Sequence, residues 1–377
     1  MLVNNVPDLR IQDLHLINFR NHPNLNIESN HKFILLLGKN GIGKTNILEA
    51  ISLLNSNKGM RNAKNSELIY NFNKSHNEWA IKANLVHKGF KHNLLIGCKF
   101  ENLDSNGSKI IKYNEERIKS ISDVSEILKI IWLDPQIENI FGESQGTKRN
   151  FLDRITYTFF INHLKFLQEY EYFIQSRTKI LSEVKWDLKL LEYFEMNIAE
   201  LSLKITTNRK NSLDKINKTL KSISSNYLRP VFTISGEIES KLSYNNHVEV
   251  FNYILKTLMN SRLKDARSKR CSIGSHKSNV VIINLEKNIE ANFCSTGEQK
   301  SMIISLIIGH SYALHNEFDI APVIILDEIF AHLDDGRCMD FIDELSKTPS
   351  QIWISSTNKN LDSLFKENCL KFCLESL

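Results

Sequence analysis

Short apolar runs alternate with polar and turn-forming residues in two parts of the chain, residues 11–37 and 79–133. Apolar runs of about four to eight residues with turn residues between them are typical of β-strands. The run from Phe33 to Leu37 is apolar throughout, as expected of a strand that is buried on both faces. Residues 80–86 and 93–100 are two further examples. We therefore predict that both parts contribute β-sheets.

A different pattern fills residues 147–229, which contain neither glycine nor proline. Apolar side chains recur there at intervals of three and four, the period of an amphipathic helix. We predict two or three long helices packed antiparallel, either as a projecting arm or as an ordinary helical subdomain, with Pro230 ending them. A strand from Val231 to Ile238 and a helix from Val248 to about Lys269 should follow.

A glycine-rich segment directly follows the first apolar run. Its sequence is Gly38-Lys39-Asn40-Gly41-Ile42-Gly43-Lys44-Thr45, which fits the phosphate-binding pattern G-x-x-x-x-G-K-[ST]; we call it the P-loop. Helical spacing in residues 46–51 places the loop between a strand and a helix, the context that phosphate binding needs, which argues against a chance match. All eight residues are candidate ATP-binding residues. We expect Lys44 to reach the β- and γ-phosphates and the Thr45 hydroxyl to bind Mg²⁺.

Two carboxylates end a second apolar run, residues 321–326. The first, Asp327, is expected to hold Mg²⁺ through water. The second, Glu328, is expected to act as the general base that polarises the attacking water. Together with Lys44, these two are the candidate catalytic residues.

The segment Ser295-Thr296-Gly297-Glu298-Gln299 stands before an apolar helix predicted from Ser301 to Leu314. Its S-x-x-E spacing is that of a helix capping box. The same geometry presents a helix N-terminus and a bare glycine backbone to an anion. Both interpretations stay open at this point.

Taken in order, these elements resemble the head of ABC-type ATPases in the SMC/Rad50/RecF branch. The resemblance implies an α/β fold, an ABC-type P-loop ATPase head with an inserted α-helical arm domain. We expect residues 1–146 to form the N-terminal part of the head, 147–270 the arm and 271–377 the C-terminal part. It also implies an ATP-dependent homodimer, in which the signature of one head closes on the ATP of the other. Further ATP-site residues follow from it: Gln136, the signature residues Ser295, Gly297, Glu298 and Gln299, and Asp334 in the D-loop.

Local matches narrow this resemblance to the RecF family. Residues 14–21, 148–153 and 274–279 are similar to three of its motifs, although Ser275 and Asn279 replace the usual proline and aspartate. The chain is also too short for the coiled coils of SMC and Rad50 proteins. The family implies a weak, DNA-stimulated ATPase in replication and repair, loading recombinase at single-strand gaps with RecO and RecR. Two alternatives stay open: another small SMC-like or OLD-type ATPase, and an ATP-gated DNA clamp with negligible turnover.

Composition adds little to this. The net charge of +5 is mildly basic, which is compatible with nucleic acid, and a hydrophobic content of 42% suffices for a packed core. No run approaches the roughly 20 apolar residues that cross a membrane. The first ten residues lack a signal core, so we expect a cytoplasmic protein. Two interpretations of a basic cluster stay about equally open: it is a solvated helix end, or it contacts the phosphates of duplex DNA. The cluster consists of Arg262, Lys264, Arg267, Lys269 and Arg270.

Overall fold

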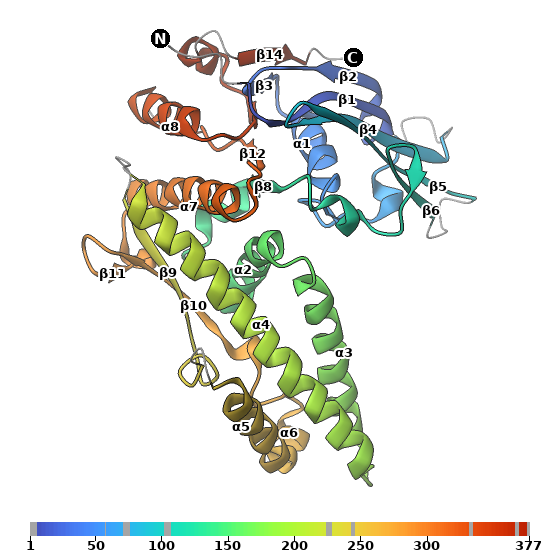
Figure 1. Cartoon of the computed structure of the whole chain (residues 1–377), viewed down its shortest axis with the longest axis vertical. Helices are drawn as coiled ribbons and strands as arrows, with labels where there is room; N and C mark the ends of the chain where they lie inside the picture. The colour runs from blue at the N-terminus through green and yellow to red at the C-terminus, as the bar shows by residue number, and fades with distance from the viewer. Residues whose placement is uncertain are drawn as a thin grey trace. The chain divides into compact units, whose positions relative to one another are not determined.

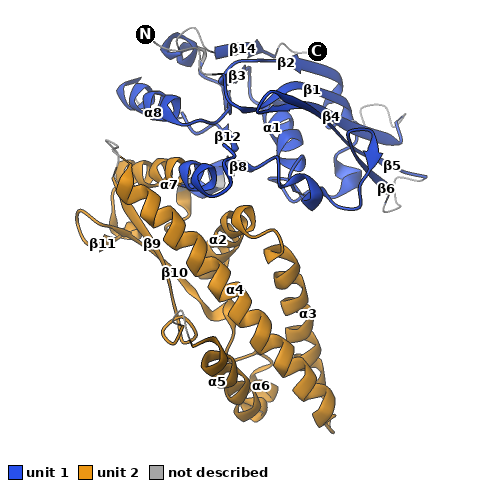
Figure 2. Ribbon diagram, in the orientation of Figure 1, with its two compact units in different colours: residues 1–138, 310–377 blue, residues 139–309 orange. Residues whose placement is uncertain are grey.

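The computed structural model divides the chain into two compact units, residues 1–138 with 310–377, and residues 139–309 (Figure 2). It describes residues 6–56, 58–70, 76–101, 107–223, 228–242, 246–331, 335–365 and 369–374, apart from the side chains of residues 136, 138 and 359. None of the helices in these ranges is both long and apolar enough to cross a membrane.

The first unit contains an antiparallel six-stranded sheet in the order β2-β1-β4-β5-β6-β7. Side chains along its central strands alternate between buried and exposed positions, because one face packs on the core and the other is polar. The strands are β1 (Leu9–Phe19), β2 (His22–Glu28), β4 (Glu78–His87), β5 (Phe90–Lys99), β6 (Ser108–Tyr113) and β7 (Glu116–Arg117). The predicted strands in residues 11–37 and 79–133 are thereby confirmed.

A parallel five-stranded sheet completes the first unit, in the order β14-β3-β13-β12-β8. Its three central strands are buried at every position, which explains why they are apolar runs rather than alternating ones. The strands are β3 (Phe33–Leu37), β8 (Ile130–Leu133), β12 (Val323–Asp327), β13 (Ile352–Ser356) and β14 (Cys369–Cys373). Since β13 lies between β3 and β12, the carboxyl ends of all three meet at one edge, where ligands bind in such sheets.

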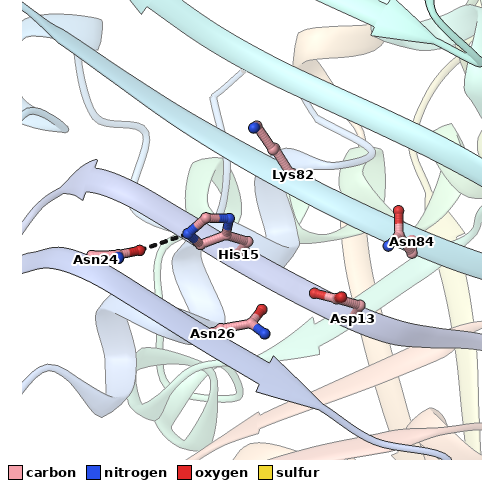
Figure 3. A pocket seen from close by; sticks show the side chains of 6 residues that line it. All are labelled: Asp13, His15, Asn24, Asn26, Lys82 and Asn84. Carbon is pink, nitrogen blue, oxygen red and sulfur yellow. Dashed lines mark hydrogen bonds between the residues drawn. The ribbon is translucent and has the colours of Figure 1, made fainter.

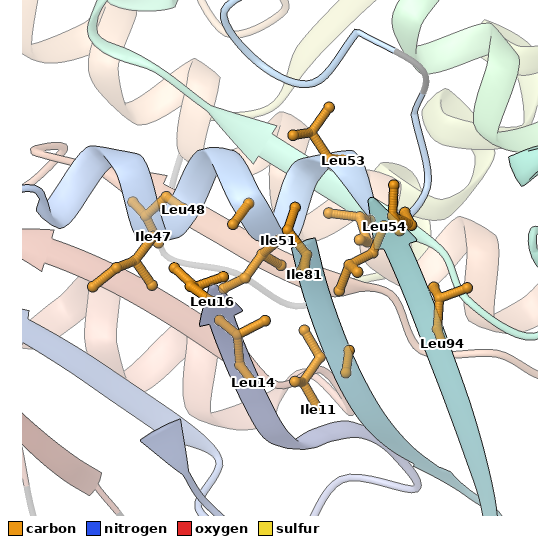
Figure 4. Close-up of a cluster of buried hydrophobic side chains, with 14 of the residues drawn as sticks. Ile11, Leu14, Leu16, Ile47, Leu48, Ile51, Leu53, Leu54, Ile81 and Leu94 are labelled. Atoms are coloured by element: carbon orange, nitrogen blue, oxygen red, sulfur yellow. The ribbon is translucent and has the colours of Figure 1, made fainter. Parts of the chain in front are cut away.

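One hydrophobic core joins helix α1 (Lys44–Leu53) to residues of both sheets. Figure 4 shows Ile47 and Ile51 of α1 among Leu14 and Leu16 of β1 and Ile81 of β4. These side chains are fully buried, and each contributes about 1.5–3 kcal/mol relative to an exposed position. The core therefore fixes α1, and with it the P-loop, on the two sheets. A further helix, α8 (Asp335–Lys347), precedes β13.

Long helices dominate the second unit, as the three- and four-residue period predicted. Figure 1 shows α3 and α4 running side by side over most of the length of α3. The helices are α2 (Gln145–Phe159), α3 (His163–Leu181), α4 (Leu188–Ser222), α5 (His247–Asn260) and α6 (Arg262–Ser268), and α7 (Thr296–Phe318) continues into the first unit. A small sheet in the order β11-β10-β9 consists of β9 (Pro230–Ser235), β10 (Asn279–Asn284) and β11 (Ile289–Glu290).

Three element boundaries differ from the sequence prediction. Helix α4 ends at Ser222, and Pro230 begins β9, which itself ends at Ser235 rather than Ile238. The single helix expected from Val248 to about Lys269 is two helices in the structure, because the helix is interrupted at Ser261. The Ser261 hydroxyl there donates to the Asp265 carboxylate at 2.9 Å. Local helical periodicity carries no signal for such a contact.

A buried arginine explains that break. The Arg177 guanidinium, on α3, donates to Glu195 of α4 at 3.0 Å and to Asp265 of α6 at 2.7 Å. It also donates to the Leu258 carbonyl at the end of α5 at 2.8 Å. Arg262, the first residue of α6, makes a second pair with Glu195. These pairs tie four helices together, and they require α6 to turn away from α5.

Two segments that carry the family resemblance, residues 148–153 and 274–279, meet around Arg209 of α4. Its guanidinium binds both carboxylate oxygens of Asp153, at 2.7 and 2.8 Å, and the Ser275 carbonyl at 2.6 Å. Burial alone would raise the pKa of Asp153, but hydrogen bonds from His163 and Arg209 outweigh it and lower that pKa. Both segments therefore have a packing role inside the second unit.

The two compact units end at residues 138 and 309, whereas the sequence suggested domain boundaries at 146 and 270. Residues 271–309 group with the helices because β10 pairs with β9 and because Gln145 and Arg149 of α2 bind the backbone of residues 278–280. Their assignment to the ATPase head stays a prediction.

Candidate nucleotide site

The P-loop connects β3 to α1, and two of its glycines have left-handed backbone conformations. The φ angle is 82° at Gly41 and 109° at Gly43, the residue that precedes α1. A Cβ atom built at Gly43 would lie 2.4 Å from the Asn21 side chain and 2.6 Å from His22 Nε2. Glycine is required there by the backbone angle and by the close approach of the β1–β2 turn.

This turn braces the P-loop through two side chains. Asn21 Nδ2 donates to the Ile42 carbonyl at 2.7 Å, and His22 Nε2 donates to the Gly43 carbonyl at 3.1 Å. Asn46 of α1 in turn donates to Asn21 Oδ1 at 2.6 Å. Burial lowers the pKa of His22, which is 2% exposed, because it disfavours the charged ring. The turn thus holds two carbonyls of the P-loop in place.

The Lys44 ammonium group is almost completely buried and has three oxygen partners. It donates to the Gly38 carbonyl at 2.8 Å and to the Lys39 carbonyl at 3.1 Å, and it pairs with Glu328 Oε1 at 3.2 Å. Three partners satisfy all three N–H groups of an ammonium. A phosphate that binds Lys44 must therefore displace at least one of them, and Glu328 is the one on a side chain.

The two carboxylates predicted from the sequence lie at the end of β12. Thr45 Oγ1 donates to Asp327 Oδ1 at 3.0 Å, so the two predicted Mg²⁺ residues are in direct contact. Glu328 has a φ of 54°, uncommon for a residue with a side chain, and its Oε2 accepts from the Thr357 N–H at 3.3 Å. The structure thus brings Lys44, Thr45, Asp327 and Glu328 into one hydrogen-bonded group.

Oxygen donors at this place suit a hard cation. A hydroxyl oxygen could bind Mg²⁺ directly, and a carboxylate could hold one of the waters that this ion usually keeps. Burial raises the pKa of Asp327, and so does neighbouring Glu328, whereas hydrogen bonds from Ser355 and Thr45 lower it. A bound cation would remove the cost of the buried carboxylate charge, so the residues present fit Mg²⁺.

The signature segment (Ser295–Gln299) belongs to the second unit. Its capping box is confirmed: the Glu298 N–H donates to Ser295 Oγ at 3.4 Å, and the Ser295 N–H donates to Glu298 Oε2 at 3.0 Å. Gln299 Nε2 donates to two preceding carbonyls, and Gly297 lies in the first turn of α7. The ATP contact of this segment stays a prediction.

Other predicted site residues have mixed placements. Gln136 lies in a short 3-10 helix, Pro135–Asn139, but its side chain is outside the described part of the structure, and Asp334 is outside it altogether. In the basic cluster, the Arg262 side chain is mostly buried against Glu195. The other four side chains, Lys264, Arg267, Lys269 and Arg270, are exposed.

A polar hollow of about 330 Å³ lies on the outer face of the six-stranded sheet, on strands β1, β2 and β4 (Figure 3). His15 Nε2 and Asn24 Oδ1 are 2.6 Å apart across it. Its lining residues are Asp13, His15, Asn24, Asn26, Lys82 and Asn84. None of them belongs to the P-loop or to the carboxylate pair, so the hollow is not the nucleotide site.

Sequence reasoning missed the residues that position the site. Ser355, at the end of β13, bonds both Asp327 and the Glu328 backbone, and Asn21 and His22 brace the P-loop. The available signal was a hydroxyl-bearing residue directly after an apolar run. This signal indicates a role at the site only once the strand order is known, because that order places β13 next to β12.

Comparison with known proteins agrees with this arrangement. A family model described as RecF/RecN/SMC N terminal domain matches residues 10–372. DNA replication and repair protein RecF of Rickettsia akari (strain Hartford) is 34% identical over 349 residues, which cover 92% of this chain and 94% of that protein. The corresponding protein of Rickettsia conorii (strain ATCC VR-613 / Malish 7) is 35% identical over the same shares of the two chains.

Two solved structures have the same fold. The recombination mediator protein RecF with ATPrS, in the RecFOR pathway, superposes with a TM-score of 0.83 at 22% identity, covering 100% of both chains. The same mediator with ATP gives 0.80 at 23% identity, covering 93% of this chain and 92% of that one. The predicted α/β fold of an ABC-type ATPase head is thereby confirmed. The matching family model and the extent of identity to its relatives show that this chain belongs to the RecF family of DNA replication and repair proteins.

Proposed function

We propose that this chain binds ATP with Mg²⁺, hydrolyses it slowly, and uses ATP to join two copies on duplex DNA beside a single-strand gap. The observation that carries the proposal is the hydrogen-bonded group of Lys44, Thr45, Asp327 and Glu328 at one edge of the parallel sheet. The order of β3, β13 and β12 in that sheet supports it, because it brings a phosphate-binding loop and two carboxylates together.

Each residue has a defined role in this proposal. The P-loop N–H groups and Lys44 bind the phosphates, and Thr45 and Asp327 hold Mg²⁺, directly and through water. Mg²⁺ held by these residues would offset the negative charge that develops on the phosphates during hydrolysis. Glu328 orients the attacking water and accepts its proton. Because Glu328 pairs with Lys44 at 3.2 Å, it becomes free for this role only after a phosphate takes its place on Lys44.

DNA and protein partners are part of the proposal. Relatives of this chain are named for DNA replication and repair, and a protein of the same fold is described as a recombination mediator in the RecFOR pathway. We infer the same setting here: the ATP-bound dimer loads recombinase onto gapped DNA with RecO and RecR, and hydrolysis, stimulated by DNA, releases it. Four exposed basic residues, Lys264, Arg267, Lys269 and Arg270, are the proposed phosphate contacts.

Two variants separate binding from hydrolysis. Lys44→Met removes the positive charge that faces the phosphates and should abolish ATP binding. Glu328→Gln keeps Asp327 for Mg²⁺ but lacks the base, so it should bind ATP normally, lose about 10²- to 10⁴-fold in turnover and accumulate as an ATP-bound dimer. Equilibrium binding, phosphate release with and without gapped DNA, and sedimentation measure these three properties.

The results also decide between the alternatives. A wild-type chain that binds ATP and DNA but releases no phosphate would be a clamp without turnover. A Glu328→Gln variant that stays monomeric at saturating ATP and Mg²⁺ would contradict the roles assigned above.

A further inference from the structure

Ser355 bonds to both residues of the carboxylate pair, Asp327 and Glu328, at the edge of the parallel sheet. Its hydroxyl is completely buried at the end of β13, the strand between the P-loop strand and the carboxylate strand. Ser355 Oγ lies 2.6 Å from Asp327 Oδ1 and 2.9 Å from the backbone nitrogen of Glu328. A backbone N–H can only donate, so the hydroxyl accepts from Glu328 and directs its single proton to Asp327.

The two hydrogen bonds of Ser355 act on different groups, the Asp327 carboxylate and the Glu328 backbone. Asp327 Oδ1 also accepts from Thr45, whose hydroxyl oxygen would hold Mg²⁺ in the proposed function. The bond from Ser355 can persist in that state, since β13 is fixed by pairing on both sides. Glu328 has a left-handed φ of 54°, and the bond from its N–H to Ser355 holds the backbone in that strained conformation.

We propose that Ser355 is a positioning residue for the ATPase reaction: it orients the Asp327 carboxylate toward Mg²⁺ and fixes the backbone that aims the Glu328 carboxylate at the γ-phosphate. The inference rests on the proposed function, because it gives these two carboxylates the same roles. Ser355 is completely buried and its hydroxyl is bonded to Asp327 and Glu328, so this role does not require contact with the nucleotide. Its loss should therefore affect turnover and the use of Mg²⁺ much more than nucleotide affinity.

The variant Ser355→Ala removes the hydroxyl alone. Turnover should fall about 10- to 100-fold, the usual effect of removing a group that orients a metal ligand. The KM for ATP should change less than about threefold, and the Mg²⁺ concentration for half-maximal nucleotide binding should rise several-fold. Ser355→Thr restores a hydroxyl and should recover most of the turnover, which a purely packing role for Ser355 would not predict.

A matched control comes from another buried hydroxyl of the same unit. Ser350 is fully buried and hydrogen-bonds Ser311 at 2.9 Å, before the start of β13 rather than at its carboxyl end. Ser350→Ala should leave turnover and Mg²⁺ use as in the wild type. If Ser355→Ala does not fold, Ser355→Cys serves in its place, because a thiol keeps most of the volume but is a weak hydrogen-bonding group.

Different results would contradict the positioning role of Ser355 and the proposed ATP hydrolysis. If the wild type turns over ATP and Ser355→Ala matches Ser350→Ala in turnover and Mg²⁺ requirement, Ser355 is not a positioning residue. If the wild type shows no turnover, the proposed hydrolysis fails. The Mg²⁺ titration of nucleotide binding still tests Ser355 in that case, and an unchanged titration would overturn the inference.

Discussion

At the scale of single residues, Gly43 of the P-loop lies directly against Asn21 and His22 of the β1–β2 turn. A left-handed φ and two near contacts, from Asn21 and His22, coincide at this residue. The same two side chains hold the carbonyls of residues 42 and 43. Any shift of Gly43 would therefore also shift the loop N–H groups that we expect to bind phosphate. Any side chain at position 43 would therefore have both a strained backbone and a clash with the turn.

Gly43→Ala should raise the Kd for ATP more than about tenfold, because the new methyl group must displace the turn that braces the loop. Gly89→Ala is the control: Gly89 has a similar φ of 85°, but no atom lies within 4 Å of a Cβ built there. Both variants should lose about 1–3 kcal/mol of stability from strain. Nucleotide titration together with chemical denaturation separates the two effects, and equal ATP affinities would contradict the bracing role.

The residues that we propose to carry the chemistry could be predicted from the sequence, and the residues that position them could not. Lys44, Thr45, Asp327 and Glu328 belong to short local patterns, and the structure brings all four together. His22 and Ser355 act across strands that are far apart in the sequence, so their roles depend on strand order. Nothing in their neighbours along the chain specifies that order.

At the scale of helices, α3, α4, α5 and α6 are joined by the buried Arg177. The exposed fraction is 1% for Arg177, 0% for Glu195 and 2% for Asp265, so solvent screens these charges very little. Removing one partner of a buried pair leaves an uncompensated charge, which costs far more than the pair itself contributes. The second unit should depend strongly on this arginine.

Arg177→Met should lower the free energy of unfolding by about 3–5 kcal/mol, because Asp265 then stays buried without its charged partner and Glu195 keeps only Arg262. Lys204→Met is the matched control, since it breaks the exposed pair of Lys204 with Glu200 on α4, a pair worth at most about 0.5 kcal/mol. Urea unfolding followed by circular dichroism compares the two variants. A loss in Arg177→Met no larger than in the control would show that α3–α6 are held by apolar packing alone.

The ion pairs around Arg177 show which helix boundaries cannot be predicted from the sequence. The long helices follow from a three- and four-residue apolar period, and the structure contains them. The break at Ser261 follows instead from ion pairs of Arg177 and Arg262 with residues on other elements. A periodic pattern describes which face of a helix is buried, but not where a tertiary contact stops the helix.

At the scale of the whole molecule, affinity for DNA should come from phosphate binding rather than from base readout. Charge reversal at Arg267, Lys269 and Arg270 should weaken binding. It should also flatten the dependence of log K on log salt, by about 0.9 for each duplex phosphate that the variant no longer neutralises. Fluorescence anisotropy over a range of salt concentrations measures both, and two unrelated duplex sequences should give similar values.

The control reverses the same number of exposed charges elsewhere in the second unit, at Lys185, Lys189 and Lys218. Its net charge equals that of the first variant, so a general charge effect would weaken DNA binding equally in both. An unchanged salt slope in the first variant would place the DNA site elsewhere on the molecule.

The proposed ATP-dependent dimer has a test of its own in the signature segment. In that dimer, Ser295 of one copy would face the γ-phosphate held by Lys44 of the other, so each nucleotide site would need two chains. Ser295→Arg should leave nucleotide affinity of the monomer nearly intact, because Ser295 does not belong to the P-loop. It should block ATP-dependent dimerisation and lower turnover at least tenfold, since a bulky side chain stands where the phosphate must approach.

Mixing the two defective chains makes this test sharper. Ser295→Arg retains a normal P-loop, and Lys44→Met retains a normal signature segment. A mixed dimer therefore contains one composite site with both parts intact and one with neither. Turnover in the mixture should exceed that of either variant alone and reach at most half of the wild-type value per dimer. Sedimentation with labelled chains would confirm that mixed dimers form. If Ser295→Arg instead loses nucleotide binding as a monomer, the signature acts within its own chain, and the dimer model is wrong.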